Sequence, residues 1–426
     1  MIKPEKLRTE GKLMKKVVMI AYHFPPEGGG SGVLRTLKFT KYLPRHGWIP
    51  HVLTLKESFY VEKDYGLMSD IPPEAVVHRT FALDSSRHLA IRGRYLSLIS
   101  VPDRFVSWVP FGVLRGARLI RDAGINVLYS TSPPATSHLI AGALKRLTGL
   151  PWVADFRDPW IEEGFFPIRG TLRYRVESFL ERHVVQNADR LIFTTPYLRK
   201  DFLSRYPNLS PDKAAVIYNG YDEADFQHLD GQVQNERFEI IHAGLVTPEF
   251  RSPIPLLKAI ATLMAEGNLH PEKIRITLLG GGPYLASKGF TDAIKNLRLN
   301  GTVEVTDRVP HHQALQRLRK AAVLLLLQAS DDTRFLIPAK AFEYLRLGRP
   351  ILALTLEGAT ADLLDGVDHC YVVNPVDESR LRNTIMSLYK SWCESPNRIR
   401  VSPSIRRYER SNLTAELAQL LEELVV

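Results

Sequence analysis

Glu343 and the start of the short helix that carries it are the parts of this sequence best suited to chemistry. The stretch IPAKAFEYLRLGRPILAL, residues 337–354, predicts a helix that begins at Pro338 and stops at Gly348. A helix start offers free backbone N–H groups and a partial positive charge, which favour an anion such as phosphate. A glutamate one turn further on can accept hydrogen bonds from paired sugar hydroxyls. Phosphate and ribose held side by side indicate a nucleotide.

A glycine-rich loop near the N-terminus is a second candidate. In AYHFPPEGGGSGVLRT, residues 21–36, Gly29 and Gly30 allow the backbone to approach a ligand closely. The glycine spacing fails the dinucleotide fingerprint in both registers, and no Gly-Lys-Ser/Thr of a P-loop occurs, which disfavours a nicotinamide enzyme. The loop is either a ligand contact or a tight turn. We favour ligand contact, because loops at the carboxyl ends of parallel strands line the ligand crevice.

Three charged residues follow a buried-strand pattern in VADFRDPW, residues 153–160. Polar side chains at a strand end usually serve a site. Arg157 stays protonated and cannot act as a base, so it would orient an acceptor or balance charge. Asp155 or Asp158 would then take the proton of an acceptor hydroxyl. An Asp-Arg pair that merely holds the loop is an equally good interpretation.

Apolar strand patterns alternate with helical patterns, and this alternation predicts an α/β fold with parallel sheets. The alternation restarts after a polar stretch at 221–237, so we expect two doubly wound, Rossmann-like domains. Their expected limits are 1–222, with 1–15 as a frayed leader, and 237–400, followed by a final helical segment at 405–426. The expected strands are residues 16–22, 51–55, 127–131, 152–156, 190–195, 214–219, 238–244, 275–281, 303–309, 323–328, 350–354 and 370–373.

Length and composition agree with a two-domain globular protein. The 426 residues are 45% hydrophobic and 24% charged. The formal charge of +10 comes from the first half, since residues 1–222 carry 32 basic and 21 acidic side chains and the rest carry 24 and 25. Such asymmetry fits an anionic surface, such as a membrane leaflet or a phosphate-bearing substrate, or simply a well-solvated surface. Two cysteines without metal or redox spacing favour a cytoplasmic protein, and no apolar run is long enough to span a membrane.

A basic, aromatic segment at 87–121 suits contact with a membrane surface. Cationic side chains beside apolar ones are typical of helices that lie on a membrane, so we expect peripheral association with the inner face of the cell membrane. Ordinary core packing with arginines extended to solvent is the competing interpretation. The residues concerned are Arg87, Arg92, Arg94, Arg104, Arg115, Arg118 and Arg121, interleaved with Leu89, Tyr95, Leu96, Ile99, Phe105, Trp108 and Phe111.

Five blocks of sequence, in order and spread over nearly the whole chain, resemble retaining glycosyltransferases of the GT-B fold, the group called family 4. The resemblance implies an N-terminal domain for the acceptor, a C-terminal domain for a nucleoside-diphosphate-sugar, and a cleft between them. The blocks are HFPPEGGGSGVLRTLKFTKYL (23–43), VADFRDPW (153–160), AVIYNGYDEADF (215–226), LLGGGP (278–283) and IPAKAFEYLRLGRPILAL (337–354).

The same resemblance implies roles for donor-site residues. The family's Gly-Arg and following Lys, which face the donor diphosphate, fall on Gly244, Leu245 and Arg251, so one cation is missing and the other is exchanged. Of two family glutamates eight residues apart, the ribose ligand falls on Glu343 and the other on Phe335. Glu343 could instead be a solvated helix residue. Further donor contacts are expected from Gly281, Gly282 and Lys340, and possible sugar contacts from Asp331 and Asp332. The two glycines could instead form only a tight strand-to-helix turn, and Lys340 could equally point to water.

No cofactor or metal is expected. Asp331-Asp332 is not a D-x-D metal motif, and His311-His312 is more suited to solvent than to a metal, so Arg251 and helix starts would neutralise the leaving diphosphate. We therefore expect a retaining glycosyltransferase that acts on a glycan or lipid-linked acceptor in surface polysaccharide synthesis, with no nucleic-acid partner. A sugar-nucleotide epimerase of the same fold and a catalytically silent sugar-nucleotide-binding subunit remain the alternatives.

Overall fold

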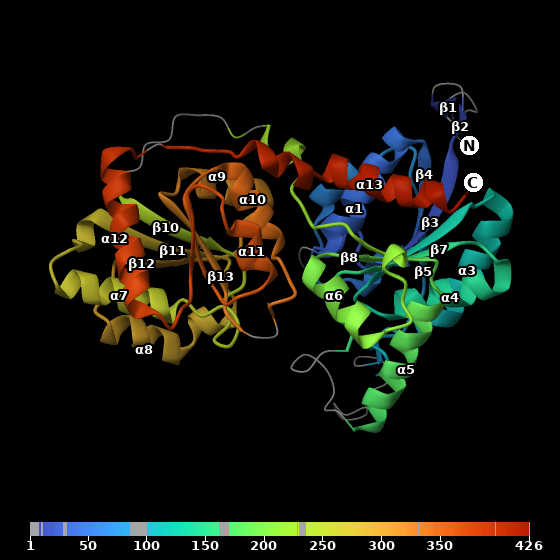
Figure 1. The fold of residues 1–426 in the computed structure, drawn as a ribbon, viewed down its shortest axis with the longest axis horizontal. Coiled ribbons are helices and arrows are strands. Elements are labelled where there is room, and N and C mark those ends of the chain that lie inside the picture. Colours follow the sequence, from blue (N-terminus) through green and yellow to red (C-terminus); the bar gives the residue numbers. More distant parts are fainter. Residues whose placement is uncertain are drawn as a thin grey trace. The chain divides into compact units, whose positions relative to one another are not determined.

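The computed structural model divides into two compact units (Figure 1). Unit 1 comprises Met1–Asn219 and Arg410–Val426, and unit 2 comprises Gly220–Glu409. The sequence had placed the first boundary at 222 and had assigned 405–426 to one final helical segment. The structure describes residues 8–9, 12–28, 32–85, 100–161, 170–227, 229, 236–330, 333–396 and 398–425.

Unit 1 is built on a seven-stranded parallel sheet in the order β5-β4-β3-β6-β7-β8-β9. The central strands are buried on both faces, which explains why they read as continuous apolar runs. Strand β3 pairs with β4 on one side and with β6 on the other, so the direction of winding reverses between β3 and β6. The strands are β3 (Lys15–Ile20), β4 (Trp48–Leu55), β5 (Val76–Thr80), β6 (Val127–Ser132), β7 (Trp152–Phe156), β8 (Arg190–Phe193) and β9 (Ala214–Val216), with a separate hairpin of β1 (Arg8–Thr9) and β2 (Lys12–Leu13).

Helices cover both faces of this sheet. The last helix, α13, packs beside α1, and its Leu413, Leu417 and Leu421 join the core that also holds Leu37 and Trp48. Figure 1 shows α3 and α4 together on the other face. The helices of unit 1 are α1 (Gly32–Tyr42), α3 (Trp108–Ala123), α4 (Thr136–Thr148), α5 (Leu172–Asn187), α6 (Pro196–Arg205) and α13 (Arg410–Glu423).

Unit 2 repeats the plan with a six-stranded parallel sheet in the order β12-β11-β10-β13-β14-β15. Winding reverses between β10 and β13. The strands are β10 (Phe238–Ala243), β11 (Ile274–Leu279), β12 (Val303–Thr306), β13 (Val323–Gln328), β14 (Ile351–Thr355) and β15 (Cys370–Val373). The helices are α7 (Ile254–Ala265), α8 (Lys288–Asn296), α9 (His311–Lys320), α10 (Ala339–Leu347), α11 (Ala359–Leu364) and α12 (Glu378–Glu394).

The prediction of two doubly wound α/β sheets is confirmed. Among the helices in the described part of the chain, none combines the length and the apolar character needed to cross a bilayer. We therefore expect the functional site at the carboxyl ends of the strands in the two sheets, where ligands bind in folds of this kind.

Candidate functional site

Two predicted donor residues of unit 2, Gly244 and Lys340, meet at the point where its winding reverses. Gly244 directly follows β10, and Lys340 lies in the first turn of α10. The Lys340 Nζ donates a hydrogen bond to the carbonyl oxygen of Ala243 at 2.5 Å. Gly244 has φ of 128°, and a Cβ there would lie 2.3 Å from the Lys340 Nζ. Only glycine therefore lets the lysine reach this backbone.

Lys340 is an unusually weak base. Burial, together with the nearby charge of Arg251, lowers the pKa of its amine to about 7, although Glu343 acts in the opposite direction. Burial also lowers the pKa of Arg251. Two partly desolvated cations that repel one another would both be stabilised by a bound anion. This is the electrostatic arrangement that a diphosphate requires.

Glu343 lies one turn beyond Lys340, and its side chain is 16% exposed. Its Oε1 lies 2.9 Å from the Nε2 of His311, at the start of α9. The sequence had favoured solvent for His311, so this partner was missed. The sequence around Glu343 or His311 gives no local indication that the two residues pair, because 32 positions separate them. The histidine orients the carboxylate, which still has a second oxygen for a ligand hydroxyl.

Gly281 and Gly282 are explained by packing within unit 2. A Cβ at Gly281 would lie 1.9 Å from the Cδ1 of Leu285. Gly282 has φ of 80°, and a Cβ there would lie 2.5 Å from the Cδ1 of Leu245. The tight-turn interpretation is thus sufficient for both glycines, and their contact with a donor remains a prediction.

The loop before α10 is held by a glutamine that the sequence analysis did not single out. Gln328 donates hydrogen bonds of 2.9 Å to the carbonyl oxygens of Thr333 and Leu336, and its Oε1 accepts one of 2.8 Å from Thr360. Phe335, in the place of a family glutamate, is buried, 6% exposed. The predicted sugar contacts Asp331 and Asp332 lie outside the described residues.

Asp155, at the end of β7 in unit 1, does not fit the predicted role of proton acceptor. Its carboxylate is fully buried and paired with Arg35 through bonds of 2.9 and 2.7 Å. The hydroxyls of Tyr129 and Thr131 donate to the same carboxylate at 2.6 and 2.9 Å. Although burial opposes it, the charge of Arg35 holds the pKa of Asp155 below its ordinary value. Its carboxylate oxygens accept hydrogen bonds from buried side chains of the core, and not from a substrate.

Arg157 is likewise occupied within the protein. Its Nε donates to the carbonyl oxygen of Ser132 at 3.0 Å, its Nη1 to that of Gly32 at 2.9 Å, and its Nη2 to that of Pro133. The guanidinium therefore joins the end of β6 to the start of α1, and its predicted role in orienting an acceptor or balancing charge remains a prediction. The alternative interpretation was an Asp-Arg pair that holds the loop. Asp155 does pair with an arginine, but the partner is Arg35 and not Arg157.

Asp158 is the one predicted catalytic residue of unit 1 that remains partly exposed. Burial raises the pKa of its carboxyl, and the charges of Arg157 and His23 oppose this effect. His23, which the sequence analysis passed over, hydrogen-bonds to Glu27 four residues later. A histidine and a glutamate in one loop after a strand were the available signal. Gly29 and Gly30, in the same loop, lie outside the described residues.

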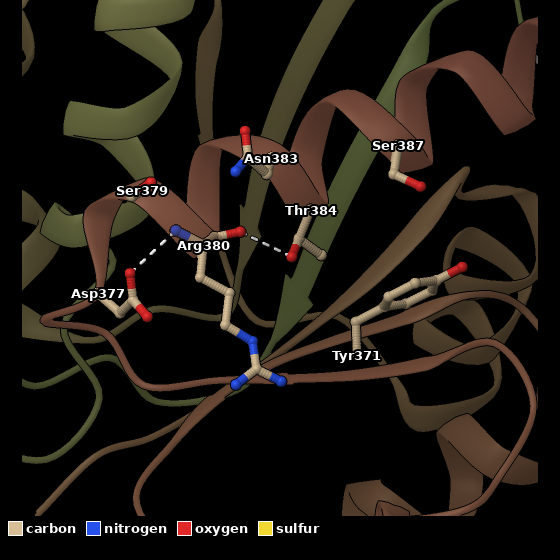
Figure 2. A pocket seen from close by; sticks show the side chains of 7 residues that line it. All are labelled: Tyr371, Asp377, Ser379, Arg380, Asn383, Thr384 and Ser387. Carbon is tan, nitrogen blue, oxygen red and sulfur yellow. Dashed lines mark hydrogen bonds between the residues drawn. The ribbon is translucent and has the colours of Figure 1, made fainter.

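A separate pocket of about 430 Å³ lies beside α12 in unit 2 and contains none of the predicted site residues. In Figure 2, Asp377 accepts from the backbone nitrogen of Arg380, and Thr384 donates to the carbonyl oxygen of the same residue. These contacts are those of an ordinary capped helix. The lining residues are Tyr371, Asp377, Ser379, Arg380, Asn383, Thr384 and Ser387.

Comparison with known proteins finds glycosyltransferase family models that match both parts of the chain. The family model described as Glycosyltransferase Family 4 matches residues 29–225, and the model described as Glycosyl transferases group 1 matches residues 237–391. A D-inositol 3-phosphate glycosyltransferase of Streptomyces scabiei is 27% identical over 197 residues, which are 44% of this chain and 43% of that protein. The match therefore spans less than half the length of this curated relative.

Solved structures show the same fold at low sequence identity. A glycosyltransferase from Rickettsia africae superposes with a TM-score of 0.66 at 12% identity, covering 96% of this chain and 98% of the other. The Anabaena protein HepE, solved in complex with UDP and glucose, gives a TM-score of 0.64 at 14% identity, covering 96% of this chain and all of the other. The two sheets of this chain thus match the GT-B fold.

Proposed function

Because this chain belongs to the GT-B glycosyltransferases, with its two halves matching family 4 and group 1, we propose that it moves a sugar from a nucleoside-diphosphate-sugar to an acceptor hydroxyl. The acceptor is a glycan or a lipid-linked sugar used in surface polysaccharide synthesis. Transfer retains the anomeric configuration and needs no metal ion. The protein works in the cytoplasm, at the inner face of the membrane.

The observation that carries this proposal is the group formed by Lys340, Arg251 and Glu343 at one end of the unit 2 sheet. The two cations suit a diphosphate, and the carboxylate suits the hydroxyls of a ribose. In transfer, charge develops on the departing diphosphate, and fixed cations stabilise this charge as a metal ion would. The structure of HepE with UDP and glucose supports a uridine nucleotide as the first donor to try.

A donor panel assayed for free nucleoside diphosphate, with and without membrane extract, tests the proposal. Release that depends on the extract is expected from a transferase. Free epimer without an acceptor would instead indicate the epimerase, which is the nearest alternative on this fold. Binding of UDP without turnover of any donor would indicate a silent subunit, an alternative that the leucine at position 245 keeps open.

Glu343→Gln is expected to weaken binding of UDP by about 10- to 100-fold, because a hydrogen bond to a charged group contributes about 1.5–3 kcal/mol. Titration calorimetry with UDP measures the change. Glu394→Gln, at an exposed position of α12, is the matched control and should bind UDP as the wild type does. Unchanged affinity in the Glu343 variant would remove the ribose assignment.

Binding of the donor diphosphate should depend on pH through Lys340. The amine has a pKa of about 7 in the free protein, and a bound diphosphate favours the charged form and raises this pKa. Binding of UDP above pH 7 should therefore take up a proton, and affinity should fall as pH rises from 7.5 to 9. Calorimetry in buffers of different ionisation enthalpy counts this proton, and Lys340→Met should abolish the uptake. Equal heats in all buffers would contradict the assignment.

The exposed face of α3 supports the proposed membrane contact. Phe111 and Leu114 are 40% and 60% exposed, and they share this face with Arg115, Arg118 and Arg121. The opposite face is closely packed, since a Cβ at Gly112 or Gly116 would clash with side chains of α4. Core packing explains Phe105 and Trp108, which are buried. Residues 87–99 of the basic segment lie outside the described residues.

Liposome flotation tests this surface. The double variant Arg118→Gln/Arg121→Gln should bind anionic vesicles about 30-fold less tightly, because each basic residue near such a surface contributes about 1 kcal/mol. Neutral vesicles are the control. Binding that is equal for both proteins, or insensitive to salt, would refute the membrane contact.

A further inference from the structure

Strands β10 and β13 of unit 2 separate at His242. Their backbone pairing ends at Ile241 and Leu324, and within the described residues no later pair joins the two strands. Each strand nevertheless continues, since β10 pairs with β11 as far as Ala243 and β13 pairs with β14 as far as Gln328. Neighbouring parallel strands that part at a reversal of winding open the crevice in which ligands of such sheets bind.

The side chain of His242 bridges this separation. Its Nδ1 lies 3.0 Å from the carbonyl oxygen of Leu325, the residue after the last paired position of β13. A carbonyl oxygen can only accept, so Nδ1 carries the proton and donates the hydrogen bond. The histidine is fully buried, with 0% of its surface exposed. The imidazole thus joins the two strands beyond the end of their backbone pairing.

The surroundings keep the His242 ring neutral. Burial lowers its pKa well below the ordinary value, and the charges of Lys340 and Arg251 act in the same direction, while hydrogen bonds to the backbone oppose them. A neutral ring has one N–H group, and here Nδ1 holds it. Replacing His242 by another neutral side chain therefore changes the hydrogen bond to Leu325 and leaves the charge beside Lys340 as it was.

The residue after His242 is the point at which α10 contacts β10. The carbonyl oxygen of Ala243 accepts the hydrogen bond of the Lys340 Nζ, and its backbone nitrogen donates to the Tyr344 hydroxyl at 3.1 Å. Both partners belong to α10, which also carries Glu343. The place of Ala243 therefore sets the place of the Lys340 ammonium group, and His242 holds the backbone immediately before it.

We propose that His242 is a positioning residue for the donor diphosphate. Its hydrogen bond to Leu325 holds the end of β10 beside β13, and through Ala243 it keeps Lys340 where the diphosphate binds. A misplacement of about 1 Å, caused from outside a site, can cost about 100-fold in its action. The inference rests on the proposed function, because it takes the diphosphate to bind at Lys340. A histidine that only stabilised the core would affect unfolding and not the recognition of phosphate.

Comparing UDP with uridine on the full chain tests this role, since the two ligands differ only in the diphosphate. His242→Leu removes the N–H group and keeps an apolar side chain in the core. We expect it to weaken binding of UDP by about 10-fold and binding of uridine by less than about twofold, because only the phosphate site is displaced. Titration calorimetry measures UDP, and ligand-observed NMR measures uridine. His242→Asn carries an amide nitrogen as many bonds from the backbone as Nδ1 and should restore UDP affinity to within about threefold of the wild type.

The Lys340→Met background tests the path of the effect. There His242→Leu should cause little further loss of UDP affinity, since no ammonium group is left to position. If His242→Leu does not fold, His242→Thr takes its place, because the threonine hydroxyl lies one bond closer to the backbone than Nδ1. The matched control is His138→Leu, since His138 is also fully buried and hydrogen-bonds to Ser130 at 2.8 Å in unit 1. It should lower the melting temperature and leave the ratio of UDP to uridine affinity unchanged.

Three results would overturn the role of His242: an equal loss of UDP and uridine affinity in the leucine variant, no loss of either, or the same loss of UDP affinity with and without the Lys340 ammonium group. Failure of the proposed function shows separately. A wild-type protein that binds UDP no more tightly than uridine has no diphosphate site, and one that binds UDP but turns over no donor is not a transferase.

Discussion

Replacing Lys340 by methionine is expected to lower the affinity for UDP by about 10- to 100-fold and kcat/KM by about 100- to 1000-fold. Methionine keeps the unbranched shape of the stem and removes the charge together with the N–H donors. The ammonium group contributes a charge-assisted bond to the bound diphosphate, and more when charge develops on the leaving group. Calorimetry with UDP and steady-state kinetics with a donor identified by the panel measure the two effects.

A matched control separates this role from a structural one. Lys390 lies exposed on α12, so Lys390→Met should leave both constants unchanged. Lys340 also donates to the carbonyl oxygen of Ala243, and loss of that bond would lower the melting temperature. A Lys340→Met protein that melts early but binds UDP normally would show that the lysine only fastens α10 to the loop after β10.

The fold was predictable because buried parallel strands have a simple sequence pattern. β13 and β14 read as uninterrupted apolar runs, and glycines or prolines mark the loops between them. Strand ends were predicted less well. The strand expected at 303–309 stops at Thr306, where polar residues begin, and the strand expected at 214–219 stops at Val216. Strand length depends on pairing with a neighbour, which a local pattern does not contain.

The site was predictable only where one short segment carries it. Lys340 and Glu343 belong to a single helix, so their spacing alone places both near its start. The partner of Glu343 comes from another helix, and the partner of Asp155 lies 120 residues away in α1. A polar residue after a strand looks the same in sequence whether it faces a ligand or a buried arginine. Burial decides between these outcomes, and burial is a property of the packed sheet.

Asp155→Asn is the second change with a large expected effect, and it acts on stability. The amide cannot balance the charge of Arg35, which is 1% exposed, so the variant leaves a buried cation without its counter-ion. Removing one member of a buried pair costs about 3–5 kcal/mol of unfolding free energy. Urea unfolding, followed by circular dichroism, measures the loss.

A double-mutant cycle with Arg35→Met distinguishes structure from catalysis. The double variant should lose less unfolding free energy than the two single variants together, because the buried charge is removed along with its partner. Asp155→Asn protein that is still folded at low temperature should keep kcat/KM within about threefold, since the carboxylate faces Arg35, Tyr129 and Thr131 and no substrate. Full stability with lost turnover would return Asp155 to the role of proton acceptor.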